Sequence, residues 1–413
     1  MKKTIGILIV LAIFLAGFNA SAIAGYDAEV IHWWVSGGES DALQVIIDEF
    51  ESRGNNWIDT PVKDSYHAKT AAISRLFSGN PPTVVQWHVG VMIKDLYEEG
   101  LLGDVNAIAQ TEQWQQVLPA VIWDYIYIHD KVVVVPATLH GQNWLWASQK
   151  VLDACGLNMP GTWDEFKTAL SIAREKGYIP LALGGQAWQE NLLFHCVAVA
   201  IGGPDFYLNA FVDHDPKTLS SDTMVKIFKS FIELRPFTDK DSPGRGWSET
   251  AALLINEKAA FQVMGDWAKG EFIKAGLTPG KEIGCALCPG TENSYLAVSD
   301  AFAMVAVKDD SALKAQARIA SIIMDPDVQK RFNLKKGSVP VRSDVSLDGF
   351  DACAKLAIQT LKTGRVLPSM NMGNPALVAS AMVGVIHNFW NNPAPDPEHA
   401  TRELAAAIKE ARF

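Results

Sequence analysis

The sequence predicts an α/β protein with two lobes, and two observations support this. Short apolar runs alternate with helical patterns along the chain, an order typical of a parallel or mixed sheet wrapped by helices. The chain has 413 residues, and without its expected leader roughly 390 remain, which exceeds the usual size of a single domain. No internal repeat or low-complexity tract interrupts this order.

The N-terminus has the pattern of a secretory signal peptide. Lys2 and Lys3 precede an apolar run over 5–18, and residues 22–24 read A-I-A, so we expect a signal peptide over residues 1–24. The apolar run is shorter than the roughly 20 residues of a spanning helix, which disfavours a membrane anchor. We therefore expect an exported protein, and the periplasm is the compartment that fits best.

The charge balance disfavours some partners. The formal net charge of −10 becomes −12 when Lys2 and Lys3 are removed. An acidic surface argues against nucleic acid and against anionic membrane surfaces. Cys285 and Cys288 form a C-x-x-C, but no second pair and no H-x-x-H follows, so zinc has weak support. We expect neither a metal nor a cofactor.

Five cysteines is an odd number, so at least one thiol stays free in an oxidising compartment. One disulfide is plausible, and Cys285 with Cys353 is the pairing that we expect. Sequence does not determine the connectivity, and the other pairings stay open.

The first part of the chain alternates strands and helices. We expect strands over 30–34 and 83–87, because these runs are short and apolar. Helices are expected over 41–50, 68–77 and 91–99; the first has Leu43, Ile46, Ile47 and Phe50 on one face.

The rest of the chain continues this alternation. A hairpin is expected around His129-Asp130, between 125–128 and 131–135, followed by a crossover at 137–141. Thr162 and Glu165 form a capping box that starts a helix reaching about Lys176. The later strands are expected over 179–183, 260–264 and 301–307. The later helices are expected over 249–257, 268–273, 312–332, 351–362 and 376–390, with a final helix after the 391–397 loop.

The segment from His32 to Ser40 predicts a carbohydrate site. Trp33 and Trp34 end a strand, and Glu39 follows a Ser-Gly-Gly turn at the start of a helix. An indole presents a flat apolar surface that suits the C–H face of a sugar, and a carboxylate accepts hydroxyl hydrogen bonds. Both tryptophans could instead be core residues, but neighbours on a strand point to opposite faces, so at most one faces a given core.

Several other strand ends and loops combine an aromatic or amide group with a charge. In open α/β sheets, ligands bind outside the carboxyl ends of the strands, so groups from both halves of the chain could meet in one cleft. These segments contain Gln86 and His88, Asn143 and Trp144, Trp267, Asp300, and Lys336.

Each of these segments also has a structural interpretation. His88 alone is more often a structural histidine, and Trp144 with Trp146 could share a core face of one strand. Lys336 could be a solvated helix end. For Asp266 we favour the N-cap of the 268–273 helix.

Two other classes of protein are compatible with these residues. An exported glycoside hydrolase could use Glu39 and Asp300 as its two carboxylates. A scaffold or adhesion protein could use its tryptophans on a flat surface. The chain has no G-x-S-x-G, phosphate loop or H-E-x-x-H, so the signal for an enzyme is weak and a binding protein is favoured.

The chain resembles the sugar-binding proteins of ABC importers, in the glucose-type cluster of the maltose-binding-like group. No single matching stretch is specific, but together they run in order across nearly all of the mature chain. They are 33–39, 79–82, 86–88, 140–146, 184–189, 264–268, 299–300 and 336–342.

The resemblance implies a two-lobed periplasmic binding protein fold, maltose-binding-like, with hinge crossovers. The first lobe would comprise 25–136 and 288–337, and the second 137–287 and 338–413. Closure on a glucose- or galactose-type monosaccharide, a substituted hexose or a short glycoside is implied, with a membrane permease as partner and a monomeric state.

The resemblance also implies the roles of individual residues. Trp33 or Trp34 would stack on the sugar from the first lobe and Trp267 from the second. The remaining contacts would come from Glu39, Gln86, His88, Asn143, Trp144, Asp300 and Lys336. Two positions depart from the family pattern: Gly141 stands where an arginine is frequent, and Asn371 with Met372 where a sugar-contacting histidine is expected.

Overall fold

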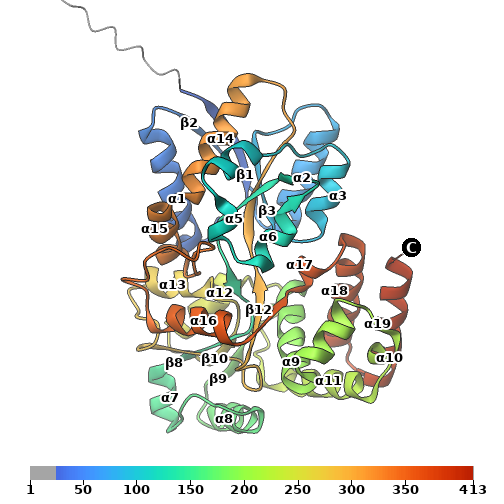
Figure 1. Cartoon of the computed structure of the whole chain (residues 1–413). Helices are drawn as coiled ribbons and strands as arrows, with labels where there is room; N and C mark the ends of the chain where they lie inside the picture. The colour runs from blue at the N-terminus through green and yellow to red at the C-terminus, as the bar shows by residue number, and fades with distance from the viewer. Residues whose placement is uncertain (1–24, 413) are drawn as a thin grey trace, which may run out of the picture.

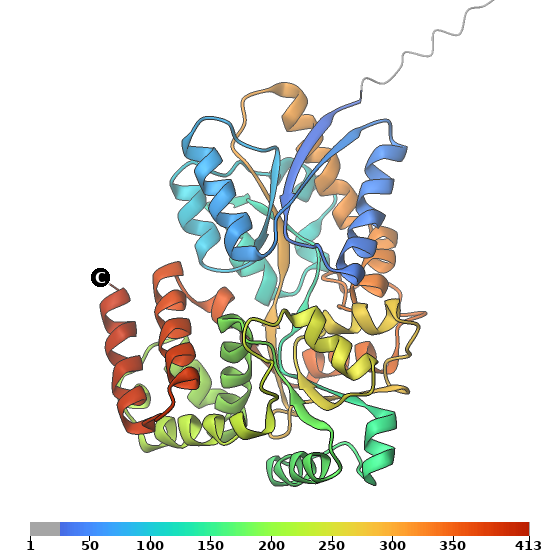
Figure 2. The same ribbon diagram turned by 180° about the vertical axis from the view of Figure 1, so that it is seen from behind.

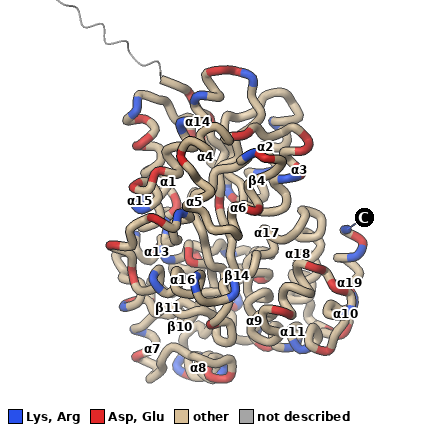
Figure 3. The backbone as a smooth tube through the Cα atoms, viewed as in Figure 1, with Lys and Arg blue, Asp and Glu red and all other residues tan. Residues whose placement is uncertain are grey.

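The computed structural model describes residues 25–412 and consists of two α/β lobes, one above the other in Figure 1. The signal peptide expected over 1–24 lies outside the described residues. Acidic and basic residues are scattered over both lobes, and Figure 3 shows neither sign gathered on one face.

The first lobe is built on a five-stranded sheet in the order β2-β1-β3-β13-β6. The first three are parallel, whereas β13 is antiparallel to both of its neighbours. The strands are β1 (Asp27–His32), β2 (Asn56–Pro61), β3 (Val84–His88), β6 (Val134–Pro136) and β13 (Asp300–Met304). The helices are α1 (Gly37–Ser52), α2 (Ser65–Phe77), α3 (Met92–Glu98), α4 (Asn106–Thr111), α5 (Trp114–Val117), α6 (Ala120–Ile126), α14 (Asp310–Met324) and α15 (Pro326–Lys336).

The second lobe contains two sheets, in the orders β11-β8-β10-β9 and β14-β12-β7. The strands are β7 (His140–Gly141), β8 (Trp144–Ser148), β9 (Ile179–Ala182), β10 (Ala259–Val263), β11 (Ile283–Leu287), β12 (Ser294–Val298) and β14 (Arg365–Pro368). The helices are α7 (Gln149–Cys155), α8 (Trp163–Glu175), α9 (Ala187–Phe211), α10 (Pro216–Leu219), α11 (Asp222–Ile232), α12 (Trp247–Ile255), α13 (Ala268–Lys274), α16 (Ala352–Thr363), α17 (Met370–Gly373), α18 (Ala376–Asn391) and α19 (Pro397–Ala411), with a short 3₁₀ turn at Arg235–Phe237.

Local sequence signals account for several element boundaries. Thr162 accepts from the Glu165 N–H and Glu165 from the Thr162 N–H, so the capping box at the start of α8 is confirmed. The expected hairpin is confirmed as β4 (Tyr127–Ile128) and β5 (Lys131–Val132). Its turn residues, His129 and Asp130, both have positive φ, the backbone that a tight hairpin requires.

Helix α9 is long and apolar enough, by length and composition alone, to cross a membrane. More than half of its most apolar stretch is buried inside the second lobe, which is the environment of a core helix. The helix is kinked at Gly203, whose φ of 78° would strain a residue with a side chain. Pro204 follows, and its missing N–H removes a helical hydrogen bond.

The chain crosses between the lobes at three places that lie side by side. Residues 137–139 join β6 to β7, Ser299 joins β12 to β13, and the segment after α15 passes Leu139, where Val339 forms an antiparallel bridge. The Ser299 hydroxyl donates to the Thr138 carbonyl at 2.7 Å and ties two crossovers together. Figure 2 shows the long path of β12 and β13 through both lobes.

One lobe boundary lies at a different residue from the one expected. A boundary at residue 288 was expected, but β12 pairs with β7 and β14 of the second lobe. The passage to the first lobe occurs at Ser299, because the next residues, in β13, pair with β3 and β6. The segment 288–298 therefore belongs to the second lobe.

The expected disulfide is present. Cys285 on β11 is bonded to Cys353 on α16, which fastens this late helix to the sheet of the second lobe. The other cysteines of the chain, Cys155, Cys196 and Cys288, are buried free thiols.

Candidate ligand-binding site between the lobes

The two adjacent tryptophans after β1 have different environments. Trp33 is half-buried, and its ring lies 5.0 Å from the ring of His88. Trp34 is only 1% exposed and packs against Phe302 and Phe332 in the core of the first lobe. Because neighbouring side chains of an extended segment point in opposite directions, only Trp33 can offer its face to a ligand.

Asp300, the first residue of β13, is buried where the lobes meet. Its Oδ2 accepts the Trp34 indole N–H at 3.3 Å, and its Oδ1 lies 3.4 Å from His88 Nε2. His140 Nε2 lies 3.7 Å from Oδ2. A carboxylate has about four lone-pair positions, so Asp300 keeps acceptor capacity beyond these partners.

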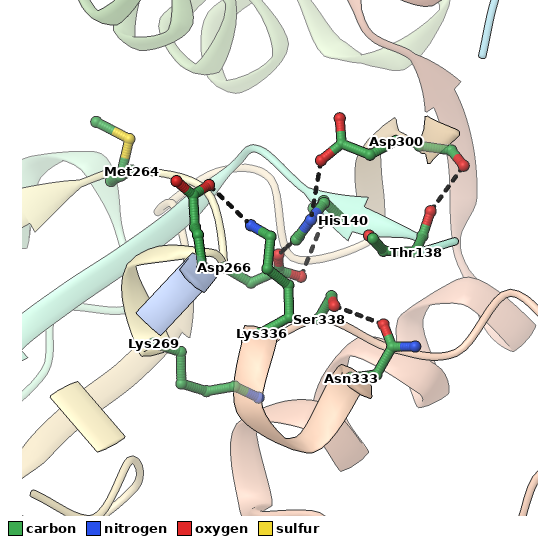
Figure 4. A network of polar contacts seen from close by, with 12 residues as sticks. Thr138, His140, Met264, Asp266, Lys269, Asp300, Asn333, Lys336 and Ser338 are labelled. Carbon is green, nitrogen blue, oxygen red and sulfur yellow. Dashed lines mark hydrogen bonds and ion pairs between the residues drawn. The ribbon is translucent and has the colours of Figure 1, made fainter. Parts of the chain in front are cut away.

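Asp266 and His140 form a buried pair that sequence reasoning did not assign to the site. His140 Nδ1 donates to Asp266, which also accepts the Gly141 N–H at 3.0 Å and the Tyr295 hydroxyl at 3.3 Å. The expected N-cap role of Asp266 is wrong, because the N-cap position of α13 is Trp267 and has no side-chain cap. Figure 4 shows Asp266, His140 and Asp300 with Lys336 beside them.

Trp267 is half-buried at the start of α13, and its ring meets His140 edge to face at 5.4 Å. The ring of Trp188, at the start of α9, lies 6.2 Å from it. Sequence reasoning gave Trp188 no role of its own. Two half-exposed indoles thus form an aromatic surface on the second lobe.

These contacts form one continuous series, which we call the interlobe row: Trp33, His88, Asp300, His140 and Trp267. Each member contacts the next, and the row runs from a half-buried indole of one lobe to a half-buried indole of the other. Its polar members lie between the two indoles. Such an arrangement can stack on both sides of a polar ring and bind its hydroxyl groups.

Three other predicted residues, Glu39, Gln86 and Lys336, are buried and bond to protein groups near the row. Lys336 donates to Glu39 at 3.1 Å, and both side chains are buried. The Gln86 side-chain oxygen accepts the Trp33 N–H at 2.9 Å, while its amide nitrogen is buried without a partner among the described residues. Glu39 and Lys336 therefore neutralise each other, and Gln86 positions Trp33.

The expectation that Asn143 and Trp144 line the crevice is corrected. The amide of Asn143 donates to Thr291 and to the Ser294 carbonyl and accepts the Leu296 N–H, so its hydrogen bonds are used within the second lobe. Trp144 is 1% exposed and stacks on Trp146 at 5.5 Å. The alternative interpretation, in which the two tryptophans share a core face, is the one that the structure shows.

Burial, together with the charges of Lys69 and His140, holds the pKa of His88 well below its usual value. His88 is therefore neutral at pH 7, with one ring nitrogen as donor and the other as acceptor.

The lobes touch on both sides of the row. Near Trp33, the Gly38 N–H at the start of α1 donates to Glu271 of α13 at 2.7 Å, and Lys274 pairs with Asp41 at 3.1 Å. On the other side, the Val91 N–H donates to the Met372 carbonyl at 3.1 Å. The lobes are therefore in direct contact on both sides of the row. Met372 itself is fully buried.

Replacing Glu271 with alanine should weaken ligand binding about five- to tenfold, because the charged hydrogen bond to Gly38 contributes about 1–1.5 kcal/mol to closure alone. Titration calorimetry measures the affinity, and stopped-flow fluorescence should assign the loss mainly to faster dissociation. Glu257→Ala is the control, because it removes an exposed carboxylate that pairs with Lys150 within the same lobe. Equal affinity in Glu271→Ala and wild type would show that this contact does not favour closure.

The fold and the row define a two-lobed ligand-binding protein. The sequence pattern of the family described as bacterial extracellular solute-binding protein matches residues 36–319. A "probable sugar-binding periplasmic protein" of Brucella suis is 40% identical over 401 residues, which covers 95% of this chain and 94% of that one. The chain therefore belongs to the bacterial extracellular solute-binding protein family.

Solved structures with low sequence identity share the fold. A maltose-bound protein of T. maritima has a TM-score of 0.77 at 18% identity, covering 93% of this chain and 99% of its own. The bacterial solute receptor AcbH, described as having an exclusive preference for β-D-galactopyranose, has a TM-score of 0.80 at 16% identity, covering 94% and 98%. The maltose-binding-like fold is thereby confirmed.

Family membership decides between the classes of protein considered above. Members are solute-binding proteins and not enzymes, so the glycoside hydrolase with Glu39 and Asp300 is dropped, and the scaffold is dropped with it. The relatives are periplasmic proteins, and this chain is assigned to the periplasm with them. Within residues 25–412, no group of three His, Cys, Asp or Glu side chains could hold a metal ion.

Proposed function

We propose that this protein is the sugar-binding component of an ABC importer and that it binds a small neutral carbohydrate, a monosaccharide of glucose or galactose type. The interlobe row carries the proposal, because it offers one indole from each lobe with hydrogen-bonding side chains between them. The sugar-binding names of the Brucella and Rhizobium relatives support the ligand class. A substituted hexose and a short glycoside are the other candidate ligands.

The charges around the row support a neutral ligand. Glu39 is paired with Lys336, and Asp266 accepts from His140. Asp300 accepts from the neutral Trp34 indole, lies 3.4 Å from the neutral His88, and faces the charge of Lys69 from a greater distance. A charged ligand would leave one buried ion without compensation, whereas a polyol satisfies donors and acceptors without adding charge.

The mechanism that we propose is capture by closure. A sugar between Trp33 and Trp267 touches both lobes only when they are closed, so it favours the closed form by these additional contacts. A membrane permease would then accept the closed, loaded protein, which we expect to be a monomer.

The energetics allow this mechanism. Micromolar affinity corresponds to about −8 kcal/mol. A hexose has about 12 heavy atoms, so each supplies roughly 0.7 kcal/mol, below the ~1.5 kcal/mol ceiling for very small ligands.

A panel of sugars tests the proposal. Glucose, galactose, mannose, maltose and cellobiose are titrated into the purified protein, with calorimetry, tryptophan fluorescence and melting temperature as readouts. We expect saturable binding of one monosaccharide with no chemical change in the sugar. Binding restricted to the disaccharides would replace the monosaccharide with a short glycoside. No response to any carbohydrate, while a charged solute binds, would overturn the proposal.

Replacing Trp267 with alanine should weaken binding about 30-fold, since truncation of a central indole costs about 2 kcal/mol. Calorimetry measures the loss. The control is Trp163→Ala, because Trp163 is also a half-buried indole, and it begins α8, which Figure 1 shows at the end of the second lobe that faces away from the first lobe. If the control weakens binding as much as Trp267→Ala, the indole of Trp267 does not contact the sugar.

A further inference from the structure

Lys69 lies beside the interlobe row, although sequence reasoning gave it no role. It is half-buried on α2, and its Nζ lies 2.9 Å from His88 Nδ1. The same ammonium lies 5.7 Å from the ring centre of Trp33 and 4.9 Å from that of Trp87. It therefore sits next to the indole that we expect to stack on the sugar, at a distance where cation and ring attract each other.

The contact with Lys69 fixes the tautomer of His88. An ammonium group only donates, so His88 Nδ1 must be the acceptor. Because His88 is neutral, its Nε2 then carries the hydrogen and directs it toward Asp300 Oδ1, 3.4 Å away. Lys69 thus determines that His88 is a donor on the side of Asp300.

Lys69 also has N–H groups that make no hydrogen bond to the described residues. An ammonium has three N–H groups, and within residues 25–412 His88 is its one hydrogen-bond partner. A hydrogen bond from an ammonium to a ligand oxygen is charge-assisted, so an oxygen beside Trp33 would be stabilised by these remaining donors.

We propose that Lys69 is a specificity-determining residue of the sugar site, which donates to one hydroxyl oxygen of the ring on Trp33 and holds His88 in the tautomer whose Nε2 hydrogen faces Asp300. This inference rests on the proposed function. It assigns a direct ligand contact to a residue of α2, an element that contributes no other residue to the row.

The charge of Lys69 gives this role a pH signature. Burial lowers the pKa of Lys69 to about 8, and the negative charge of Asp300 opposes that shift. The other ionisable groups are His88 on β3, which Lys69 contacts and on which His140 also acts, and two groups near it in the sequence, the N-cap Asp64 and His67, which pair with each other. Between pH 7 and 9 Lys69 loses its proton, so affinity should fall by up to about tenfold as the pH rises through 8.

The test combines variants with deoxy sugars. Glucose and galactose, each with its 2-, 3-, 4- and 6-deoxy analogues, are titrated into the wild type, Lys69→Met and the exposed control Lys63→Met, at pH 7 and 9. For the wild type and the control, we expect one deoxy analogue to bind at least tenfold more weakly than its parent. In Lys69→Met that ratio should fall toward one, and the difference between pH 7 and 9 should vanish.

The outcomes separate the two proposals. If the wild type binds a parent sugar and Lys69→Met keeps the same deoxy ratios and pH dependence, the role of Lys69 is overturned while the proposed function stands. If the wild type binds neither parent nor any analogue, the monosaccharide function fails and the inference fails with it. Melting curves check folding, and Lys69→Gln replaces Lys69→Met if the latter melts early.

Discussion

Replacing Asp300 with alanine is expected to weaken sugar binding by about 100- to 1,000-fold. The carboxylate has about four lone-pair positions; Trp34 donates to one, and His88 Nε2 lies 3.4 Å from Oδ1, which leaves room for two sugar hydroxyls. A hydrogen bond to a charged group contributes about 1.5–3 kcal/mol, and the lower part of that range, taken for two bonds, gives a loss of about 3–4 kcal/mol of binding free energy. Titration calorimetry with the sugar identified by the panel measures the effect.

Two further variants make this result specific. Asp300→Asn keeps an acceptor for the Trp34 indole but removes the charge, and we expect an intermediate loss. Asp48→Ala removes an exposed carboxylate of α1 and should leave affinity unchanged. A folded Asp300→Ala protein, judged by its melting curve, that binds as tightly as the wild type would remove Asp300 from the site.

Removing the disulfide between Cys285 and Cys353 should lower the free energy of unfolding by about 4 kcal/mol. The bond closes a loop with a sequence separation of 68 residues, and the loss of loop-closure entropy in the unfolded chain predicts this magnitude. For a protein of this length the change corresponds to a fall in Tm of about 5 °C. Cys285→Ser with Cys353→Ser, followed by calorimetric melting, measures it.

The control for the disulfide is Cys155→Ser, which alters a buried free thiol and should have a much smaller effect. A thiol reductant should lower the Tm of the wild type but not that of the double serine variant. If the reductant shifts both proteins equally, the stability does not come from this bond.

Much of the fold could be predicted from the sequence because its signals are local. The alternation of strands and helices, the capping box of Thr162 and the hairpin turn at His129-Asp130 each depend on a few neighbouring residues. The lobe boundary near 288 could not be placed, because strand β12 is assigned to a lobe by its partners β7 and β14, which are distant in sequence.

The candidate site was predicted where aromatic residues follow strands, and less well where the environment decides a role. Trp33 and Trp34 look alike in sequence, and only packing against Phe302 and Phe332 buries the second. Asp266 precedes a helix in the sequence, as a cap residue would. Its carboxylate instead accepts a hydrogen bond from His140, which is 126 residues away in the sequence.

Lys69 and Trp188 show a further limit of sequence reasoning. A lysine within an amphipathic helix carries no local signal of a partner on another element. Trp188 was noted within a matching stretch, yet its proximity to Trp267 arises only when α9 and α13 are packed together.

The position of Asp300 directly after Ser299 has a consequence for unloading. The backbone passes from one lobe to the other at Ser299. A hinge movement of the lobes would therefore change the backbone one residue away from Asp300. A rotation of the lobes about Ser299 would therefore also move the Asp300 carboxylate. If a transporter separates the two lobes, the same movement would shift Asp300 relative to a ligand held between them, so release would not require a competing group at each contact.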